Sequence, residues 1–156
     1  MKNWFTGSGE EVSINDIVYQ IKEHSFMNGT TYIGTDSFFK KRECNFSTAI
    51  CLYGADDQRG GRYFFQKSKV PKKYFPNLSI RMIREAEKTI DIAKLIIKKC
   101  SFAKLELHLD ISEANKQEGT SKFTNMLVGY VKGSGFDCKV KPHAFAAASI
   151  ADKHSK

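Results

Sequence analysis

Four acidic side chains lie singly in this 156-residue sequence, each beside an apolar segment. Asp36 and Asp110 end runs of alternating apolar residues that are typical of strands, whereas Glu85 and Asp152 lie in helix-like runs. Carboxylates repel one another, so a fold that gathers them is unfavourable unless cations neutralise their charge. If the fold brings these segments together, we therefore expect the four acids to hold divalent metal ions.

Each of these acids, taken alone, also has an ordinary structural explanation. Asp36 could close a turn at a strand end, Asp110 could be a solvated acid, and Asp152 could lie on a frayed terminal helix. Glu85 differs, because helical periodicity puts it inside the apolar arc of residues 79–99. An acid that faces a core needs either a basic partner or a functional site, so the set as a whole favours a site.

The elements that must position these acids follow a mixed α/β order. Residues 1–28 are predicted as a lead-in and a helix that Ser13 caps. Hairpin connections join the next three strands and helices join the later ones, which predicts a mixed five-stranded sheet flanked by helices, in one domain over residues 1–156. The predicted strands cover residues 30–39, 46–53, 62–69, 104–111 and 136–141; residues 79–99, 122–132 and the alanine-rich tail are predicted helices, and 112–122 a polar loop.

Composition restricts the class of protein. Hydrophobic residues make up 41% of the chain and charged residues 27%, as in ordinary globular domains. No apolar run approaches the roughly 20 residues of a membrane span, and the first residues lack the apolar segment of a signal peptide. We therefore expect a cytoplasmic protein with no membrane partner. The four cysteines have no CxxC spacing, so we expect reduced, mostly buried thiols and neither zinc nor a disulfide framework.

The net charge of +8, from 25 basic and 17 acidic residues, suits a polyanionic partner. Solvated lysines that serve solubility alone would give the same charge. The contrast between a basic protein and single acids at strand ends favours nucleic acid as the partner. Candidate contacts to its backbone are Lys40, Lys41, Arg42, Lys139, Lys141 and Lys153, and His143 is a further candidate for substrate binding.

Several short segments occur in the order found in a known group of small bacterial proteins. They are YIGTDS, RGGRYFF, RMIREAEKTIDIA, LHLDIS, GYVKGSGFDCKVKP and AFAAASIADKHSK. On these motifs the sequence resembles the YkuK-type RNase H-like family over almost its whole length. The resemblance implies an RNase H-like fold and a nuclease site whose metal ligands are Asp36, Glu85, Asp110 and Asp152.

The chemistry expected of such a site is hydrolysis of phosphodiester bonds with two Mg²⁺ or Mn²⁺ ions. Ligands that are all oxygen favour these hard cations over zinc. We expect Asp36 to bridge both ions, Glu85 and Asp110 to bind one of them, and Asp152 to bind the other. His143 could move a proton at the product step, although a turn histidine is the simpler interpretation.

Other interpretations stay open on the sequence alone. The chain could be a non-catalytic nucleic-acid binder that keeps the fold, or a junction resolvase that acts as a dimer. A sugar hydrolase with a carboxylate pair is less compatible with the basic charge. The sequence does not choose between RNA, DNA and hybrid substrates, between endonuclease and exonuclease action, or between monomer and oligomer.

Overall fold

A mixed sheet lies between two layers of helix in the computed structural model, which describes residues 3–111 and 118–156. This is the α/β class that the sequence predicts. In chain order the elements are β1 (Trp4–Thr6), β2 (Glu11–Val12), α1 (Ile14–Phe26), β3 (Thr30–Lys40), β4 (Glu43–Tyr53), β5 (Arg62–Pro71), the 3₁₀-helix η1 (Lys72–Tyr74), α2 (Leu78–Lys99), β6 (Leu105–Leu109), α3 (Glu118–Gly133), β7 (Asp137–Lys139), the π-helix η2 (Ala146–Ala151) and α4 (Asp152–Ser155).

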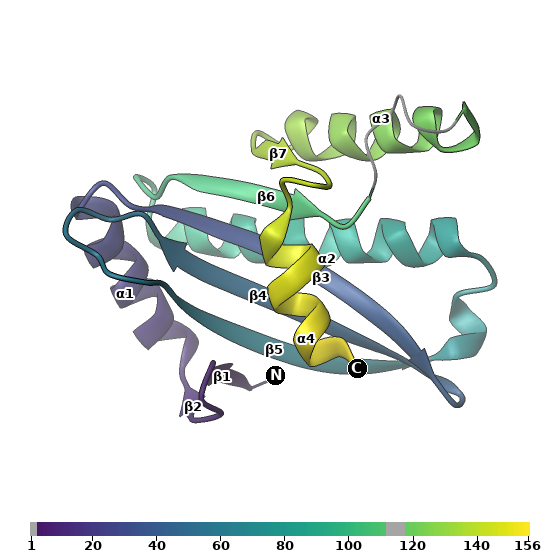
Figure 1. Cartoon of the computed structure of the whole chain (residues 1–156), viewed down its shortest axis with the longest axis horizontal. Coiled ribbons are helices and arrows are strands. Elements are labelled where there is room, and N and C mark those ends of the chain that lie inside the picture. The colour runs from purple at the N-terminus through teal and green to yellow at the C-terminus, as the bar shows by residue number, and fades with distance from the viewer. Residues whose placement is uncertain (1–2, 112–117) are drawn as a thin grey trace.

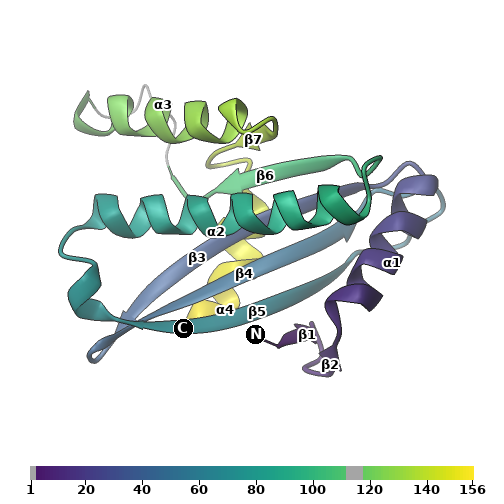
Figure 2. The same cartoon turned by 180° about the vertical axis from the view of Figure 1, so that it is seen from behind.

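The two faces of the sheet carry different helices. The C-terminal segment, η2 followed by α4, crosses one face (Figure 1), and α2 runs along the other face, which is turned toward the viewer in Figure 2. Apolar side chains of α1, α2 and α3 pack against the sheet in one main core, because each helix presents an apolar stripe at helical spacing. Its largest buried members include Ile17, Ile21, Ile33, Ile50, Leu52, Ile90, Ile96, Leu107 and Val131.

The strand order within the described residues is β2-β1-β5-β4-β3-β6-β7. β3, β4 and β5 pair antiparallel, whereas β6 is parallel to β3 and β7 is parallel to β6. A two-residue turn joins β3 to β4, and Lys41 adopts the positive φ (58°) that such turns require. The predicted change from antiparallel hairpins to parallel crossovers is therefore confirmed.

The predicted count of five strands was wrong, because the N-terminal lead-in adds two strands to the sheet. β1 pairs antiparallel with β5, where Trp4 lies opposite Gln66, and β2 pairs with β1, where Val12 lies opposite Trp4. These strands have only three and two residues, too few for an alternating pattern to show. Ser13 caps α1 as predicted, since its Oγ accepts from the Asp16 N–H at 3.1 Å.

The remaining predicted elements are present with shifted boundaries. The predicted loop at 112–122 lies partly outside the described residues, which omit 112–117, and α3 already begins at Glu118. The last predicted strand is shorter than expected and covers Asp137–Lys139. The alanine-rich tail is helical, as its composition predicts, but it is divided into η2 and α4.

Two expectations from composition can be compared with the structure. All four cysteines are free, and Cys44, Cys51 and Cys100 are buried, so the predicted thiol burial is confirmed. In the described ranges, no helix combines the length and the apolar character needed to cross a bilayer.

The C-terminal segment approaches the sheet closely because small residues line the contact. Ala146, Ala147 and Ala151 are fully buried, and Ala146 and Ala151 pack with Ala49 of β4. Gly34 of β3 lies directly under η2, where an added Cβ would lie 2.4 Å from the Ala147 backbone nitrogen. Only glycine fits at this position, since the backbone of η2 leaves no room for a side chain.

We expect Gly34→Ala to lower the free energy of unfolding by about 1–3 kcal/mol, because the extra methyl group must displace η2. Urea denaturation measures this change. The matched control is Gly129→Ala in α3, where nothing lies within 4 Å of an added Cβ. That variant should be neutral or gain up to about 1 kcal/mol from helix propensity. Equal stability of the Gly34→Ala variant and the parent protein would contradict the close approach.

Candidate active site

Asp36 lies in β3 on the sheet face that η2 and α4 cross. Alternation along the strand places Gly34, Asp36 and Phe38 on this face. The side chain of Asp36 is buried, with 6% exposure, and Ser155 Oγ donates to its Oδ2 at 3.2 Å. The carboxyl group therefore lies under the C-terminal helix, where water solvates it poorly.

Asp110 follows directly after β6, the parallel neighbour of β3. The register pairs Thr35 with Leu109, so the next residues along the two strands are Asp36 and Asp110. Leu109 belongs to the main core, and Asp110 therefore shares the opposite face with Asp36, as alternation predicts. Lys141 Nζ lies 2.8 Å from Asp110 Oδ1 and forms an ion pair with it.

Asp152 is the first residue of α4, and contacts with β5 hold this helix in place. The His154 ring stacks on Phe65 with a centroid distance of 3.7 Å, and its Nε2 lies 2.9 Å from Tyr63 Oη. One turn after Asp152, Lys156 Nζ lies 3.3 Å from its Oδ2. The position of Asp152 thus depends on aromatic contacts made by its neighbours on the helix.

His108 fixes the start of the same segment from β6. Its Nδ1 accepts a hydrogen bond from the Ala146 N–H at 3.1 Å, so the ring proton lies on Nε2. Nε2 then donates to Glu106 Oε1 at 3.1 Å. Burial lowers the pKa of His108, which keeps the ring neutral and able to accept.

The carboxyl groups of Asp152 and Asp110 lie close enough to Asp36 to act on its pKa. Burial is the largest cause that raises the pKa of Asp36 to about 8, and hydrogen bonds with the carboxyl groups of Asp152 and Asp110, together with the charge of Asp110, act in the same direction. A hydrogen bond between two carboxyl groups needs a proton on one of them. Without another cation, the cluster therefore retains a proton near neutral pH.

Glu85 approaches from the other helical layer. It lies in α2 with 7% exposure and faces the sheet, as the helical arc predicts. Ser37 Oγ donates to Glu85 Oε2, and Glu85 and Asp110 line one small cavity. Burial raises the pKa of Glu85 to about 8; the Ser37 hydrogen bond lowers it, and the charges of Asp36 and Asp110 raise it.

A chain of buried hydroxyl groups holds α2 against β3 beside Glu85. Thr89 Oγ1 donates to Thr35 Oγ1 at 2.8 Å, and Thr35 Oγ1 lies 2.9 Å from Thr48 Oγ1 of β4. Thr89 lies one turn after Glu85, and its hydroxyl also contacts the Glu85 carbonyl at 3.1 Å. These polar contacts fix the depth at which α2 presents its acid to the sheet.

The structure thus places the carboxyl groups of Asp110 and Asp152 beside that of Asp36, and Glu85 approaches from α2 on the other side of the sheet. In the described part of the chain, no three His, Cys, Asp or Glu side chains are arranged so that they could hold a metal ion as they stand. The donor set is nevertheless suited to a hard divalent cation, because all its atoms are carboxylate oxygens and their mutual repulsion favours a positive charge. The residues therefore fit such an ion in the chemistry of their donor atoms.

A family model described as Ribonuclease H-like matches residues 12–156, which is almost the whole chain. The chain belongs to the ribonuclease H-like family. This match confirms the family indicated by the sequence motifs, and the mixed sheet is consistent with an RNase H-like fold. A search of curated proteins found no match. Membership of the RNase H-like family suggests a function related to nucleic acid.

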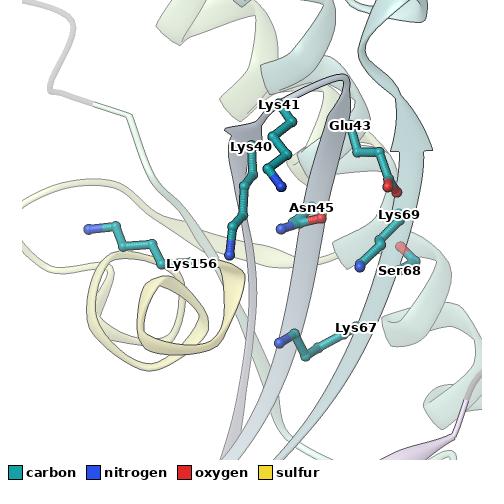
Figure 3. Close-up of a pocket in the computed structure, with 8 residues that line it drawn as sticks. All are labelled: Lys40, Lys41, Glu43, Asn45, Lys67, Ser68, Lys69 and Lys156. Atoms are coloured by element: carbon teal, nitrogen blue, oxygen red, sulfur yellow. The ribbon is translucent and has the colours of Figure 1, made fainter.

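A basic groove lies on the same face of this RNase H-like chain as Asp36, and Lys156, which pairs with Asp152, is one of the residues that line it. It has a volume of about 510 Å³, and the predicted contacts Lys40 and Lys41 both line it. Figure 3 shows the side chains of Lys40 and Lys41, at the end of β3, and those of Lys67 and Lys69 in β5 extending toward the same space, whereas the Lys156 side chain points away from them. The lining residues are Lys40, Lys41, Glu43, Asn45, Lys67, Ser68, Lys69 and Lys156.

Two other predicted substrate contacts, Lys141 and His143, lie outside this groove. Lys141 pairs with Asp110 and belongs to the acid cluster, and His143 is exposed in the connection between β7 and η2. Sequence reasoning missed Lys67 and Lys69, which line the groove from β5. Their spacing of two residues in a strand was the available signal, because it places both side chains on one face.

Proposed function

We propose that this RNase H-like chain is a divalent-metal-dependent nuclease that hydrolyses phosphodiester bonds in nucleic acid. The observation that carries the proposal is the contact of Asp36 with Asp110 and Asp152 in a buried setting, where the Asp36 pKa is raised to about 8. Structural acids are normally paired with bases, whereas this group contacts other acids. Such a cluster destabilises the fold, because its carboxylates repel one another. Bound cations would offset this repulsion, so a role in cation binding accounts for the cluster.

Asp36, Glu85, Asp110 and Asp152 are the residues that would hold the ions. Mg²⁺ or Mn²⁺ bound there would activate water and stabilise charge on the leaving oxygen. Asp36 lies centrally, since it contacts Asp110, which follows β6, and Asp152, the first residue of α4. Ser37 orients Glu85 by donating to its Oε2, so the acid from α2 is held toward β3.

Two lysines form ion pairs with acids of the proposed site. Lys141 and Lys156 pair with Asp110 and Asp152, and both lysines are largely exposed at 47% and 59%. An exposed lysine is flexible and can exchange a carboxylate for a phosphate oxygen at low cost. We propose that these side chains contact the substrate backbone once cations neutralise the acids.

The test is cleavage of labelled single-stranded RNA, single-stranded DNA, hybrid, duplex and four-way junction substrates in Mg²⁺, Mn²⁺ or EDTA. We expect cleavage of at least one substrate with either ion and none in EDTA, because four carboxylates alone repel a polyanion. Folded protein that cuts no substrate with either ion would contradict the proposal. A preference for junctions together with a dimeric mass would place the activity with the resolvases.

A non-catalytic nucleic-acid binder is the second candidate. The ion pairs of Lys141 with Asp110 and of Lys156 with Asp152 favour it, because they satisfy two of the acids without a metal. This candidate predicts salt-sensitive binding without turnover. It also predicts no shift of the melting temperature when Mn²⁺ is added, since no ion would bind the folded state preferentially.

A further inference from the structure

Two grooves on this chain join into one basic surface at the β3–β4 turn. The groove beside the acids shares Lys41 with a second groove of about 720 Å³ that lies around η1. Glu43 is the only acidic residue among the described residues that line the two grooves. We call this surface the basic track; its basic members are Lys40, Lys41, Arg42, Lys67, Lys69, Lys72, Lys73 and Lys156.

The strand register places Lys40, Lys67 and Lys69, which line the groove beside the acids, on the same face of the sheet as Asp36. Lys40 lies four residues after Asp36 in β3, and Lys67 lies opposite Ser47, the cross-strand partner of Asp36. Lys69 follows on the same face of β5. Lysines of two strands therefore gather on this face of the sheet (Figure 3), with Lys67 level with Asp36 and with Lys40 and Lys69 farther toward the β3–β4 turn.

Lys40, Lys67 and Lys69, which line the groove beside the acids, form no ion pair with a described acidic residue. Within the described residues, the lysine ion pairs are those of Lys141 and Lys156 with the acid cluster, and none involves Lys40, Lys67 or Lys69. Gathered unpaired cations repel one another, so the surface is complementary to a polyanion. Lys156 belongs to both regions, because it lines the groove and pairs with Asp152 at 3.3 Å. The track therefore ends at the acids.

An exposed aromatic ring lies between Asp36 and Lys40 along β3. Phe38 is 39% exposed, and alternation in β3 puts it on the same face as Asp36 and Lys40. An aromatic ring beside a row of cations is the arrangement that binds unpaired bases, since the ring stacks on a base while the cations hold the phosphates. Bases in a duplex are stacked on each other and cannot use such a ring.

We infer that the basic track binds single-stranded nucleic acid, with one base stacked on Phe38 and the backbone phosphates along the lysines. Together with the proposed nuclease function, on which this part of the inference rests, the track delivers a single strand to the acid cluster. Binding itself requires no metal and no turnover. Strand binding and metal-dependent cleavage can therefore be tested separately, because EDTA removes the metal that cleavage needs and leaves binding unaffected.

The test is binding of a fluorescent single-stranded oligonucleotide in EDTA over a series of salt concentrations. We expect the triple variant Lys40→Ala/Lys67→Ala/Lys69→Ala to bind at least about tenfold more weakly at low salt and to reduce the slope of log K against log salt by about 2. The matched control removes the same charge from α2, on the opposite face, as Lys94→Ala/Lys98→Ala/Lys99→Ala. The control should keep the parent affinity and slope.

Phe38 gives a second readout that general electrostatics would not change. We expect Phe38→Ala to weaken binding at least about fivefold with an unchanged salt slope, and Phe38→Trp to restore it. Trp4 is buried, so quenching of the fluorescence of the introduced indole, read against the parent protein, would report stacking directly. Equal affinity of the two triple variants, or tighter binding of duplex than of single strand, would overturn the inference. Cleavage that persists in that case would leave the nuclease proposal standing.

Discussion

Replacing Asp36 by asparagine is expected to lower metal-dependent cleavage by at least about a thousandfold, which corresponds to ~4 kcal/mol of activation free energy. Asp36 contacts acids from two other elements, so its charge is the one shared by the whole cluster. The amide keeps the shape of the side chain and can still accept from Ser155. Initial rates on the best substrate, measured at saturating Mn²⁺, give the effect.

The matched control for this prediction is Asp91→Asn. Asp91 is exposed in α2, outside the apolar arc, so the same chemical change there should leave the cleavage rate within about twofold. Far-UV circular dichroism and urea denaturation establish that both variants are folded. Cleavage at the parent rate by folded Asp36→Asn protein would exclude Asp36 as a ligand and, with it, the proposed mechanism.

Local periodicity explains why part of the candidate site could be predicted from the sequence. Alternation in residues 105–109 places the leucines in the core and Asp110 on the opposite face, whatever the other strands do. The helical arc places Glu85 toward the sheet in the same way, and the side chain is buried as expected. Repeats of apolar residues with a period of 2 in strands or 3.6 in helices are properties of single elements. They can therefore be recognised in the sequence without knowledge of the fold.

The arrangement of different elements could not be predicted in this way. That Asp36 contacts Asp110 and Asp152 depends on β6 pairing parallel with β3 and on α4 crossing that face. The pairing of Lys156 with Asp152 and the groove that it lines depend on the same long-range packing. β1 and β2 were missed for a related reason, because strands of three and two residues form only where a neighbour such as β5 already exists.

In EDTA, the free energy of unfolding should fall as the pH rises from about 4 to 8. Burial, with contributions from neighbouring acids, raises the pKa of Asp36 from 3.8 to about 8 and that of Glu85 from 4.5 to about 8. The folded chain therefore binds more protons than the unfolded chain within this window. The extra stability is fully present below the unfolded pKa values and is lost as the pH passes through the folded ones. We expect a loss of at least about 2 kcal/mol, measured by urea denaturation at unit steps of pH.

Divalent metal should reverse this loss, because the ion takes the place of the proton in the cluster. At pH 8, Mn²⁺ at about 100 times its dissociation constant is expected to raise the free energy of unfolding by ~2.7 kcal/mol. At pH 5 the gain should be smaller, since protons compete for the same oxygens. Asp36→Asn should flatten the pH dependence and weaken the response to Mn²⁺ together, whereas Asp91→Asn should change neither. A free energy of unfolding that rises from pH 5 to pH 8 in EDTA would mean that the buried acids are paired with bases in the folded chain. That result would contradict a cluster of carboxyl groups that shares a proton around Asp36.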